Sequence, residues 1–150
     1  MNNQVQAELK KIFNGRFSTS ESTRANYARG EDTYDPVLSK AVVFPETNEE
    51  VSKILSLCNE HKIPVVPFGT GTSLEGNVVG NDKGITISLE KMNKILSVNA
   101  EDFDCRVQAC VTKEQLNEYL REDGVFFPID PGANAAIGGM ASTSASGTMA

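Results

Sequence analysis

Apolar and polar residues alternate along this chain in blocks that predict strands and helices in turn. Two short apolar runs, Ala41–Phe44 and Ile63–Pro67, predict buried strands. Between them, Thr47 and Glu50 have the spacing of a capping box, which predicts the start of a helix. The apolar stripe of that helix consists of Val51, Ile54, Leu55 and Cys58. A strand, a helix and a strand with short connections predict a parallel pair of strands joined by a right-handed crossover.

Further elements are expected before and after this unit. Val5, Leu9 and Ile12 recur at helical spacing and predict a short helix that Gly15 ends. Residues 18–35 are polar and rich in turn formers, so they are interpreted as an irregular lead-in. The run 84–89 predicts another strand, and the sheet is expected to continue at residues 97–98.

The last third of the sequence predicts a second α/β segment. Residues 103–111 alternate in polarity like a half-buried strand. Thr112 and Gln115 predict the cap of another helix, which Gly124 closes. The apolar positions of that helix are Leu116, Tyr119 and Leu120. An extended segment, a turn at residues 130–132 and a helix beginning at Ile137 are expected to follow.

Two glycine-rich stretches, residues 67–76 and 138–147, are the candidate chemistry of the chain. Residues without bulky side chains let backbone N–H groups approach an anion closely, and glycine adopts positive φ without strain. The first stretch follows a predicted parallel strand, and open α/β sheets bind ligands at the carboxyl ends of such strands. The second is expected to begin a helix whose N-terminus faces the anion. Together they predict a nucleotide-binding site.

Two common phosphate motifs do not fit. A P-loop needs Lys and then Ser or Thr after its last glycine, whereas Gly76 is followed by Asn77 and Val78. The dinucleotide fingerprint needs a third glycine where Leu74 stands. A connecting loop without a ligand is the alternative interpretation of the first stretch taken alone.

Four separated motifs resemble the FAD-binding domain of the p-cresol methylhydroxylase and vanillyl-alcohol oxidase superfamily. They are VVFPETNEEVSKIL, IPVVPFGTGTSLEG, ISLEKMNKIL and FFPIDPGANAAIGGMASTSASGTMA. Within it the chain is most similar to the D-lactate dehydrogenase (cytochrome) group and to the glycolate oxidase flavin subunit, and Phe68 favours the former. The resemblance implies an α/β (α+β) fold of the PCMH type, with a small parallel βαβ subdomain followed by an incomplete second α/β subdomain.

The resemblance also implies a domain organisation and a cofactor. Residues 1–34 are expected to form an N-terminal helix and lead-in, and residues 35–150 the truncated FAD-binding domain, without the substrate-binding cap. The implied cofactor is noncovalent FAD, since neither glycine stretch contains a histidine tether. The implied cofactor-binding residues are Pro67, Phe68, Gly69, Thr70, Gly71, Thr72, Ser73, Gly76, Pro131, Gly132, Ile137, Gly138, Gly139, Ser142, Ser146 and Gly147. In related sequences glycine usually stands at the position of Cys110 and often at the position of Ser73, so this chain departs from the pattern at both.

Composition restricts the partners. The net charge of −6 and the absence of a Lys/Arg cluster argue against nucleic acid. No transmembrane segment or signal peptide is expected, so the chain is predicted to be cytoplasmic, with a peripheral membrane association left open. The cysteines, Cys58, Cys105 and Cys110, are expected to be reduced structural thiols, and His61 a solvated helix-end residue. No metal site is predicted.

The implied reaction is oxidation of a D-2-hydroxy acid, D-lactate to pyruvate above all, with a cytochrome or quinone as electron acceptor. No catalytic acid or base is assigned among residues 1–150, so the chain alone is expected to be inactive. A glycolate oxidase-type subunit, a reductase acting on an enolpyruvyl substrate and a noncatalytic nucleotide-binding module are the alternatives. An incomplete sheet whose exposed edge promotes aggregation is a further one.

Overall fold

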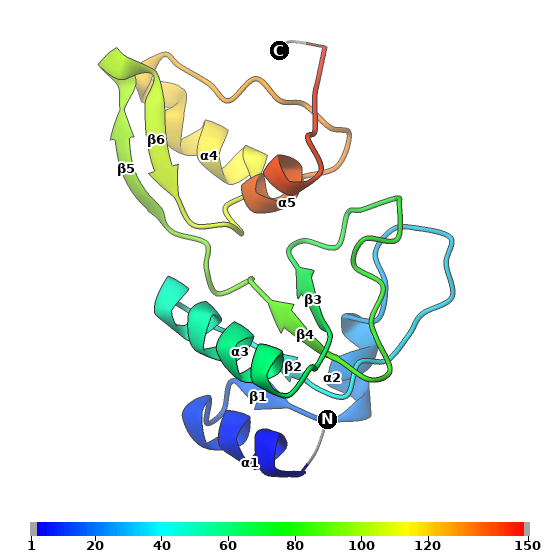
Figure 1. Ribbon diagram of the computed structural model, residues 1–150. Coiled ribbons are helices and arrows are strands. Elements are labelled where there is room, and N and C mark those ends of the chain that lie inside the picture. Colours follow the sequence, from blue (N-terminus) through cyan, green and yellow to red (C-terminus); the bar gives the residue numbers. More distant parts are fainter. Residues whose placement is uncertain (1–2, 149–150) are drawn as a thin grey trace. The chain divides into compact units, whose positions relative to one another are not determined.

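The computed structural model describes residues 3–148 of the chain. Between Lys91 and Met92 the chain divides into two compact units, each with its own hydrophobic core. Figure 1 shows the elements of both units.

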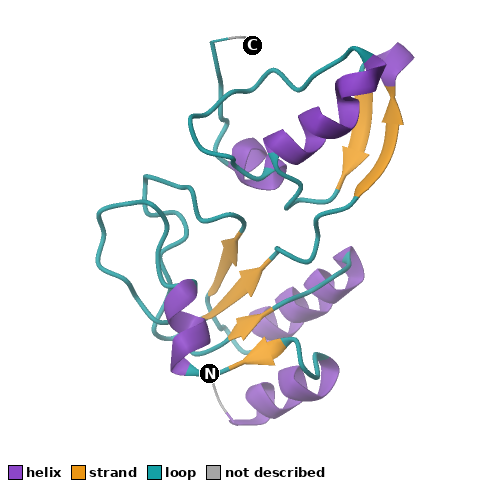
Figure 2. Ribbon diagram, turned by 180° about the vertical axis from the view of Figure 1, so that it is seen from behind, coloured by secondary structure: helices purple, strands orange, loops and turns teal. Residues whose placement is uncertain are grey.

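The first unit is built on a four-stranded sheet in the order β1-β2-β4-β3. Strands β2, β4 and β3 are parallel, and β1 is antiparallel to β2. The strands are β1 (Phe17–Ser18), β2 (Val42–Val43), β3 (Val65–Phe68) and β4 (Ile85–Ser88). The helices are α1 (Asn3–Ile12), α2 (Glu21–Asn26) and α3 (Asn48–Glu60). Helix α3 lies on one face of the sheet and α2 on the opposite face (Figure 2).

Strand β4 is one of the two inner strands of this sheet, and all four of its residues are buried. Ile85 and Ile87 belong to the main core cluster, together with side chains from α1 and α3. Thr86 alternates with them, and its hydroxyl donates to Ser39 Oγ at 2.8 Å. A strand buried on both faces is typical of a parallel sheet with covered faces.

The position of β4 corrects one prediction. The strands on either side of α3 were expected to pair directly, but β4 lies between β2 and β3 and pairs with both. The strand–helix–strand unit is parallel as predicted, with one strand inserted. The fully buried strand β4 takes an inner position, and its sequence lies outside the strand–helix–strand segment. The sequence of that segment alone therefore does not predict the strand order.

Helix α3 begins where the capping pattern predicts. Thr47 is its N-cap, and its hydroxyl accepts a hydrogen bond from the Glu50 N–H at 3.3 Å. Ile54 and Cys58 are buried, as expected for the apolar stripe, whereas Leu55 is 45% exposed. Leu57 packs against the core instead, so the buried face is rotated from the one predicted.

The beginning of the chain is more ordered than predicted. Helix α1 is confirmed, and Val5 and Leu9 are buried, but Ile12 is 42% exposed and Phe13 takes its place in the core. The polar segment predicted as irregular begins at the last residue of strand β1 and contains helix α2. Ser20 caps α2, because its hydroxyl accepts from the Thr23 N–H at 3.2 Å.

The second unit contains a separate two-stranded antiparallel sheet of β5 and β6. The expectation that the first sheet continues beyond residue 91 is therefore wrong. The elements are β5 (Ile95–Asn99), the short helix η1 (Ala100–Asp102), β6 (Asp104–Val107), α4 (Lys113–Leu120), η2 (Arg121–Asp123) and α5 (Ile137–Ser142). Its core is formed by Val111, Leu116 and Leu120.

Strand β6 is shorter than predicted and starts from a tight connection. Phe103 has a φ of +55° and is 84% exposed, so it belongs to the turn before the strand. The strand ends at Val107, and a turn closed by the hydrogen bond from the Val111 N–H to Gln108 O follows it. Cys105 is consequently exposed rather than buried, whereas Cys58 and Cys110 are buried.

Helix α4 confirms the second capping prediction. Thr112 Oγ1 accepts from the Gln115 N–H at 3.2 Å, and Leu116 and Leu120 are buried. Tyr119 was predicted on the same face but is 60% exposed. The short helix η2 follows α4, and Gly124 ends it with a φ of +70°.

Candidate cofactor-binding site

The first glycine stretch leaves the carboxyl end of β3, as the sequence predicts. Pro67 and Phe68 are the last two residues of that strand, and Phe68 is paired with Ser88 of β4. The loop that follows contains Gly69, Thr70, Gly71, Thr72, Ser73 and Gly76. It starts at the edge of a parallel sheet where α/β proteins bind their ligands.

Unused hydrogen-bond donors are the main chemical feature of this loop. From Gly69 to Gly76, no backbone N–H donates to an acceptor among residues 3–148. The hydroxyls of Thr70 and Thr72 lie 3.4 Å apart and are exposed. A run of unpaired N–H groups in a glycine-containing loop forms a concave donor surface suited to an anion. Polar backbone groups of this kind are otherwise satisfied by water or by a ligand.

The segment predicted as an irregular lead-in contacts and supports the loop. The Glu31 N–H donates to Gly71 O at 3.0 Å. A Cβ atom at Gly30 would lie 2.7 Å from Gly71 O, so only glycine fits there. Asp32 is buried, and its carboxylate accepts from the N–H groups of Gly30 and Tyr34. The pattern of a glycine and an aspartate two residues apart was visible in the sequence as a turn signal.

Two glycines of the loop are required by its geometry. Gly71 and Gly76 have φ values of +75° and +72°. A Cβ on Gly71 would lie 2.7 Å from Phe68 Cζ, and one on Gly76 would lie 2.8 Å from Tyr34 Cδ2. Phe68 therefore lies against the loop that follows it, and Tyr34 lies against the other end of the loop.

Helix α5 begins at the second glycine stretch, as predicted. Its first two N–H groups already donate to backbone carbonyls of the second unit. The Ile137 N–H donates to Val111 O and the Gly138 N–H donates to Ala109 O, both at 2.8 Å. A Cβ on Gly138 would also lie 2.8 Å from Ala109 Cβ. These two residues anchor α5 within the second unit, so they are not free to donate to an anion. Gly139 differs, because its N–H has no acceptor among the described residues and a Cβ there would meet no atom within 4 Å.

Asp130 contacts the segment that follows helix α5. Its carboxylate accepts from Thr148 N at 2.9 Å and from Thr148 Oγ1 at 3.1 Å. A Cβ on Gly147 would overlap the Asp130 carboxylate, so this glycine permits a close approach. The segment after α5 thus lies beside the turn that contains Pro131 and Gly132.

The two predicted serines differ in how they are used. Ser142 Oγ donates to Gly138 O at 2.8 Å, within helix α5. Ser146 is exposed and makes no hydrogen bond with another described residue. Ser146 is therefore the one of the two whose hydroxyl is available.

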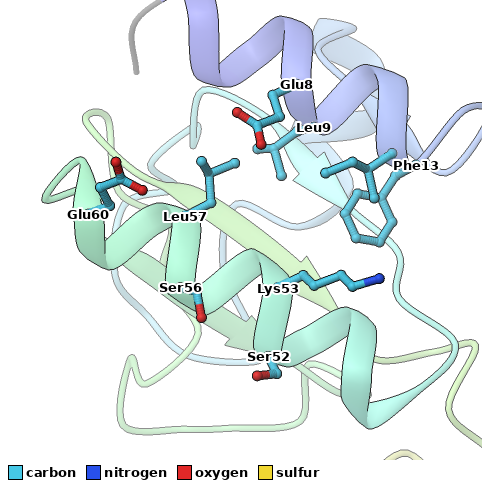
Figure 3. Close-up of a pocket in the computed structure, with 9 residues that line it drawn as sticks. Glu8, Leu9, Phe13, Ser52, Lys53, Ser56, Leu57 and Glu60 are labelled. Atoms are coloured by element: carbon cyan, nitrogen blue, oxygen red, sulfur yellow. The ribbon is translucent and has the colours of Figure 1, made fainter.

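A groove of about 400 Å³ lies between α1 and α3 in the first unit (Figure 3). Its lining mixes apolar and charged side chains: Glu8, Leu9, Ile12, Phe13, Ser52, Lys53, Ser56, Leu57 and Glu60. It contains none of the predicted site residues. Within the described part of the chain, no group of three His, Cys, Asp or Glu side chains is placed to hold a metal ion. No helix of residues 3–148 is both long and apolar enough to cross a membrane.

Comparison with known proteins identifies the family. The chain belongs to the FAD binding domain family, which matches residues 39–150. It is 44% identical over 133 residues to a probable mitochondrial D-lactate dehydrogenase of Danio rerio, covering 89% of this chain and 27% of that protein. It is 39% identical over 146 residues to a mitochondrial D-lactate dehydrogenase [cytochrome] of Arabidopsis thaliana, covering 96% of this chain and 26% of that protein.

The fold is also found among solved structures. A structure of p-cresol methylhydroxylase with bound substrate matches with a TM-score of 0.76 at 23% identity, over 95% of this chain and 28% of that one. The PCMH-type fold and FAD as the cofactor, both expected from the sequence, are confirmed. The chain spans about a quarter of the length of the curated relatives that it matches.

The residues present fit the diphosphate of such a cofactor. Donors from the loop of Gly69–Gly76 are unpaired, and the loop is held in shape by glycines that side chains could not replace. Backbone N–H groups hold a diphosphate by hydrogen bonding without adding a formal charge of their own.

Proposed function

We propose that this chain is the FAD-binding part of an FAD-dependent D-2-hydroxy acid dehydrogenase that oxidises D-lactate to pyruvate. The observation that carries the proposal is the unpaired donor run of Gly69–Gly76 at the carboxyl end of β3, in a chain of the FAD binding domain family. The names of the relatives from Danio rerio and Arabidopsis thaliana support D-lactate as the substrate.

The proposed contacts follow from which groups are available. Thr70, Gly71, Thr72 and Ser73 are the proposed donors to the diphosphate, and Pro67, Phe68, Gly69 and Gly76 shape the loop that carries them. In the second unit Gly139, Ser146 and Gly147 are the proposed donors. Ile137, Gly138 and Ser142 act as the framework that holds them, and Pro131 and Gly132 line the flavin side. Bound FAD would supply the two-electron acceptor for the hydroxy acid.

Noncovalent binding is part of the proposal. Neither glycine stretch contains a histidine or a tyrosine that could form a covalent link to the flavin. Since no general base and no cation for the substrate carboxylate are assigned to residues 1–150, the chain by itself is proposed to bind FAD without oxidising D-lactate. A cytochrome or a quinone is the proposed acceptor in the whole protein, and the cytoplasm, with or without peripheral membrane contact, is its proposed compartment.

Titration of the purified chain with FAD tests this proposal. We expect saturable quenching of flavin fluorescence, a yellow protein after gel filtration, and complete release of the flavin on denaturation. A colourless protein that leaves flavin fluorescence unchanged would favour a noncatalytic module. In the whole protein, D-lactate should bleach the flavin absorbance more efficiently than glycolate, and the reverse order would identify a glycolate oxidase-type subunit.

A further inference from the structure

Tyr27 connects three elements of the first unit near the beginning of the glycine loop. It is the C-cap residue of helix α2. Its hydroxyl donates to Glu90 Oε2 at 2.6 Å, just beyond the carboxyl end of β4. Its ring makes edge contacts with Phe44 and Phe68, with centroid distances of 5.6 Å and 5.1 Å. Aromatic rings in such edge-to-face contacts attract one another beyond the effect of burial alone.

Phe68 links the ring of Tyr27 to the glycine loop. It is 7% exposed, and it is the last residue before Gly69. Its carbonyl accepts from the Leu89 N–H at 2.9 Å, and its ring lies directly under Gly71. A displaced Phe68 ring would therefore move the backbone of Gly71, whose neighbours carry the unpaired N–H groups.

We propose that Tyr27 is a positioning residue that, with its hydroxyl held by Glu90, fixes the Phe68 ring and thereby the conformation of the loop of Gly69–Gly76 that receives the FAD diphosphate. This inference rests on the proposed function for its ligand. The ring contact of Tyr27 is with Phe68, the residue just before the loop, so Tyr27 acts through Phe68. The Glu90 carboxylate belongs to the arrangement because it determines where the phenol points.

The state of the phenol is consistent with this role. Burial, and then the hydrogen bond to Glu90, raise the pKa of Tyr27 to about 12, while Ser88 acts in the opposite direction. The phenol is therefore a neutral donor at physiological pH. A neutral donor facing a carboxylate forms a charge-assisted hydrogen bond, which is stronger than one between neutral groups.

The experiment compares Tyr27→Phe, Glu90→Gln and Glu90→Ala with the unaltered chain. FAD affinity is measured by flavin fluorescence well below the melting temperature, and hydrogen exchange of the Leu89 amide is measured by NMR without FAD. Tyr27→Phe and Glu90→Ala should each weaken FAD binding by about tenfold and speed Leu89 exchange, since a hydrogen bond to a charged group is lost. Glu90→Gln keeps an acceptor and should restore most of the affinity. Tyr119→Phe is the matched control, because that tyrosine is exposed on α4.

The outcomes are distinguishable. If Tyr27→Phe lowers only the melting temperature and leaves FAD affinity and Leu89 exchange unchanged, Tyr27 has a merely structural role and the inference is overturned. Equal losses in Glu90→Gln and Glu90→Ala would also overturn it, because the hydrogen bond would then not matter. If the unaltered chain binds no FAD while Tyr27→Phe still speeds Leu89 exchange, the proposed function fails and the positioning of the loop stands.

Discussion

Arg16 and Glu50 form a two-pronged ion pair that joins the segment before β1 to the first turn of α3. Nη1 of Arg16 donates to Oε2 of Glu50 and Nη2 donates to Oε1, both at 2.6 Å. Nη1 also donates to Phe44 O, and Glu50 Oε2 accepts from the Glu46 N–H at 2.7 Å. Both side chains are about four-fifths buried. The pair therefore holds α3 to the edge of the sheet.

Because of this ion pair, the stability of the first unit should decrease at acid pH. The hydrogen bonds from Arg16 lower the pKa of Glu50 from 4.5 to about 2. Because the folded pKa is depressed, the stabilisation is complete above pH 4.5 and is lost as pH falls toward 2. Glu50→Gln should cost about 2 kcal/mol of unfolding free energy at neutral pH and flatten this acid limb. Denaturant unfolding followed by circular dichroism across this pH range measures both effects.

The control for this prediction is the exposed pair of Arg121 and Glu118. Its side chains are largely in solvent, and such pairs add little to stability. Glu118→Gln should leave the unfolding curve essentially unchanged at every pH. An equal loss of stability in the two variants would mean that net charge, rather than the buried geometry at Glu50, controls the acid limb.

Local signals in the sequence predict where helices begin better than they predict which strands pair in the sheet. The hydroxyls of Thr47 and Thr112 cap α3 and α4 as expected, because a cap depends on residues within one turn. The insertion of β4 between β2 and β3 depends on the burial of the whole sheet, which no window of the sequence contains. The short helix α2 was missed because its segment is polar and its cap lacks the glutamate of a capping box.

The same distinction applies to the candidate site. The glycines in the sequence predict the turns of the loop 69–76, because backbone positions with positive φ favour glycine. The support from Gly30 and Asp32 could not be predicted, because it comes from a segment about forty positions earlier that meets the loop only in the folded chain. The N–H groups of Ile137 and Gly138 were expected to face an anion, but the turns after β6 accept from them instead.

Gly71→Ala should weaken FAD binding more than it destabilises the chain. The substitution places a Cβ against Phe68 and forces a residue other than glycine to a φ of +75°. We expect a loss of about 1–2 kcal/mol in unfolding free energy and a loss of FAD affinity of about tenfold or more. Gly124→Ala is matched in φ, lies outside the predicted site and meets no atom within 4 Å. It should show a similar backbone cost with normal FAD affinity, and equal binding losses in both variants would contradict the assignment of the loop.

Cys105 should be the first thiol to react with a water-soluble reagent. It is exposed on β6, whereas Cys58 is 1% and Cys110 6% exposed. Burial also raises the pKa of Cys58, which reduces its thiolate fraction further. One equivalent of an aromatic disulfide reagent should react rapidly with the native chain and none with Cys105→Ser. Rapid reaction of two thiols in the native chain would show that a buried cysteine is accessible.

Gly139 offers a test in which stability and binding change in opposite directions. It lies inside helix α5 with a φ in the ordinary range, and a Cβ there would meet no atom within 4 Å. Nothing among the described residues therefore requires glycine, and glycine inside a helix costs about 1 kcal/mol relative to alanine. Gly139→Ala should stabilise the FAD-free chain by up to about that amount and weaken FAD binding, because the added methyl group would obstruct the close approach of the cofactor. Melting curves with and without FAD measure both terms. A variant that gains stability and binds FAD normally would remove Gly139 from the site, and Gly138→Ala, which meets Ala109, should lose stability instead.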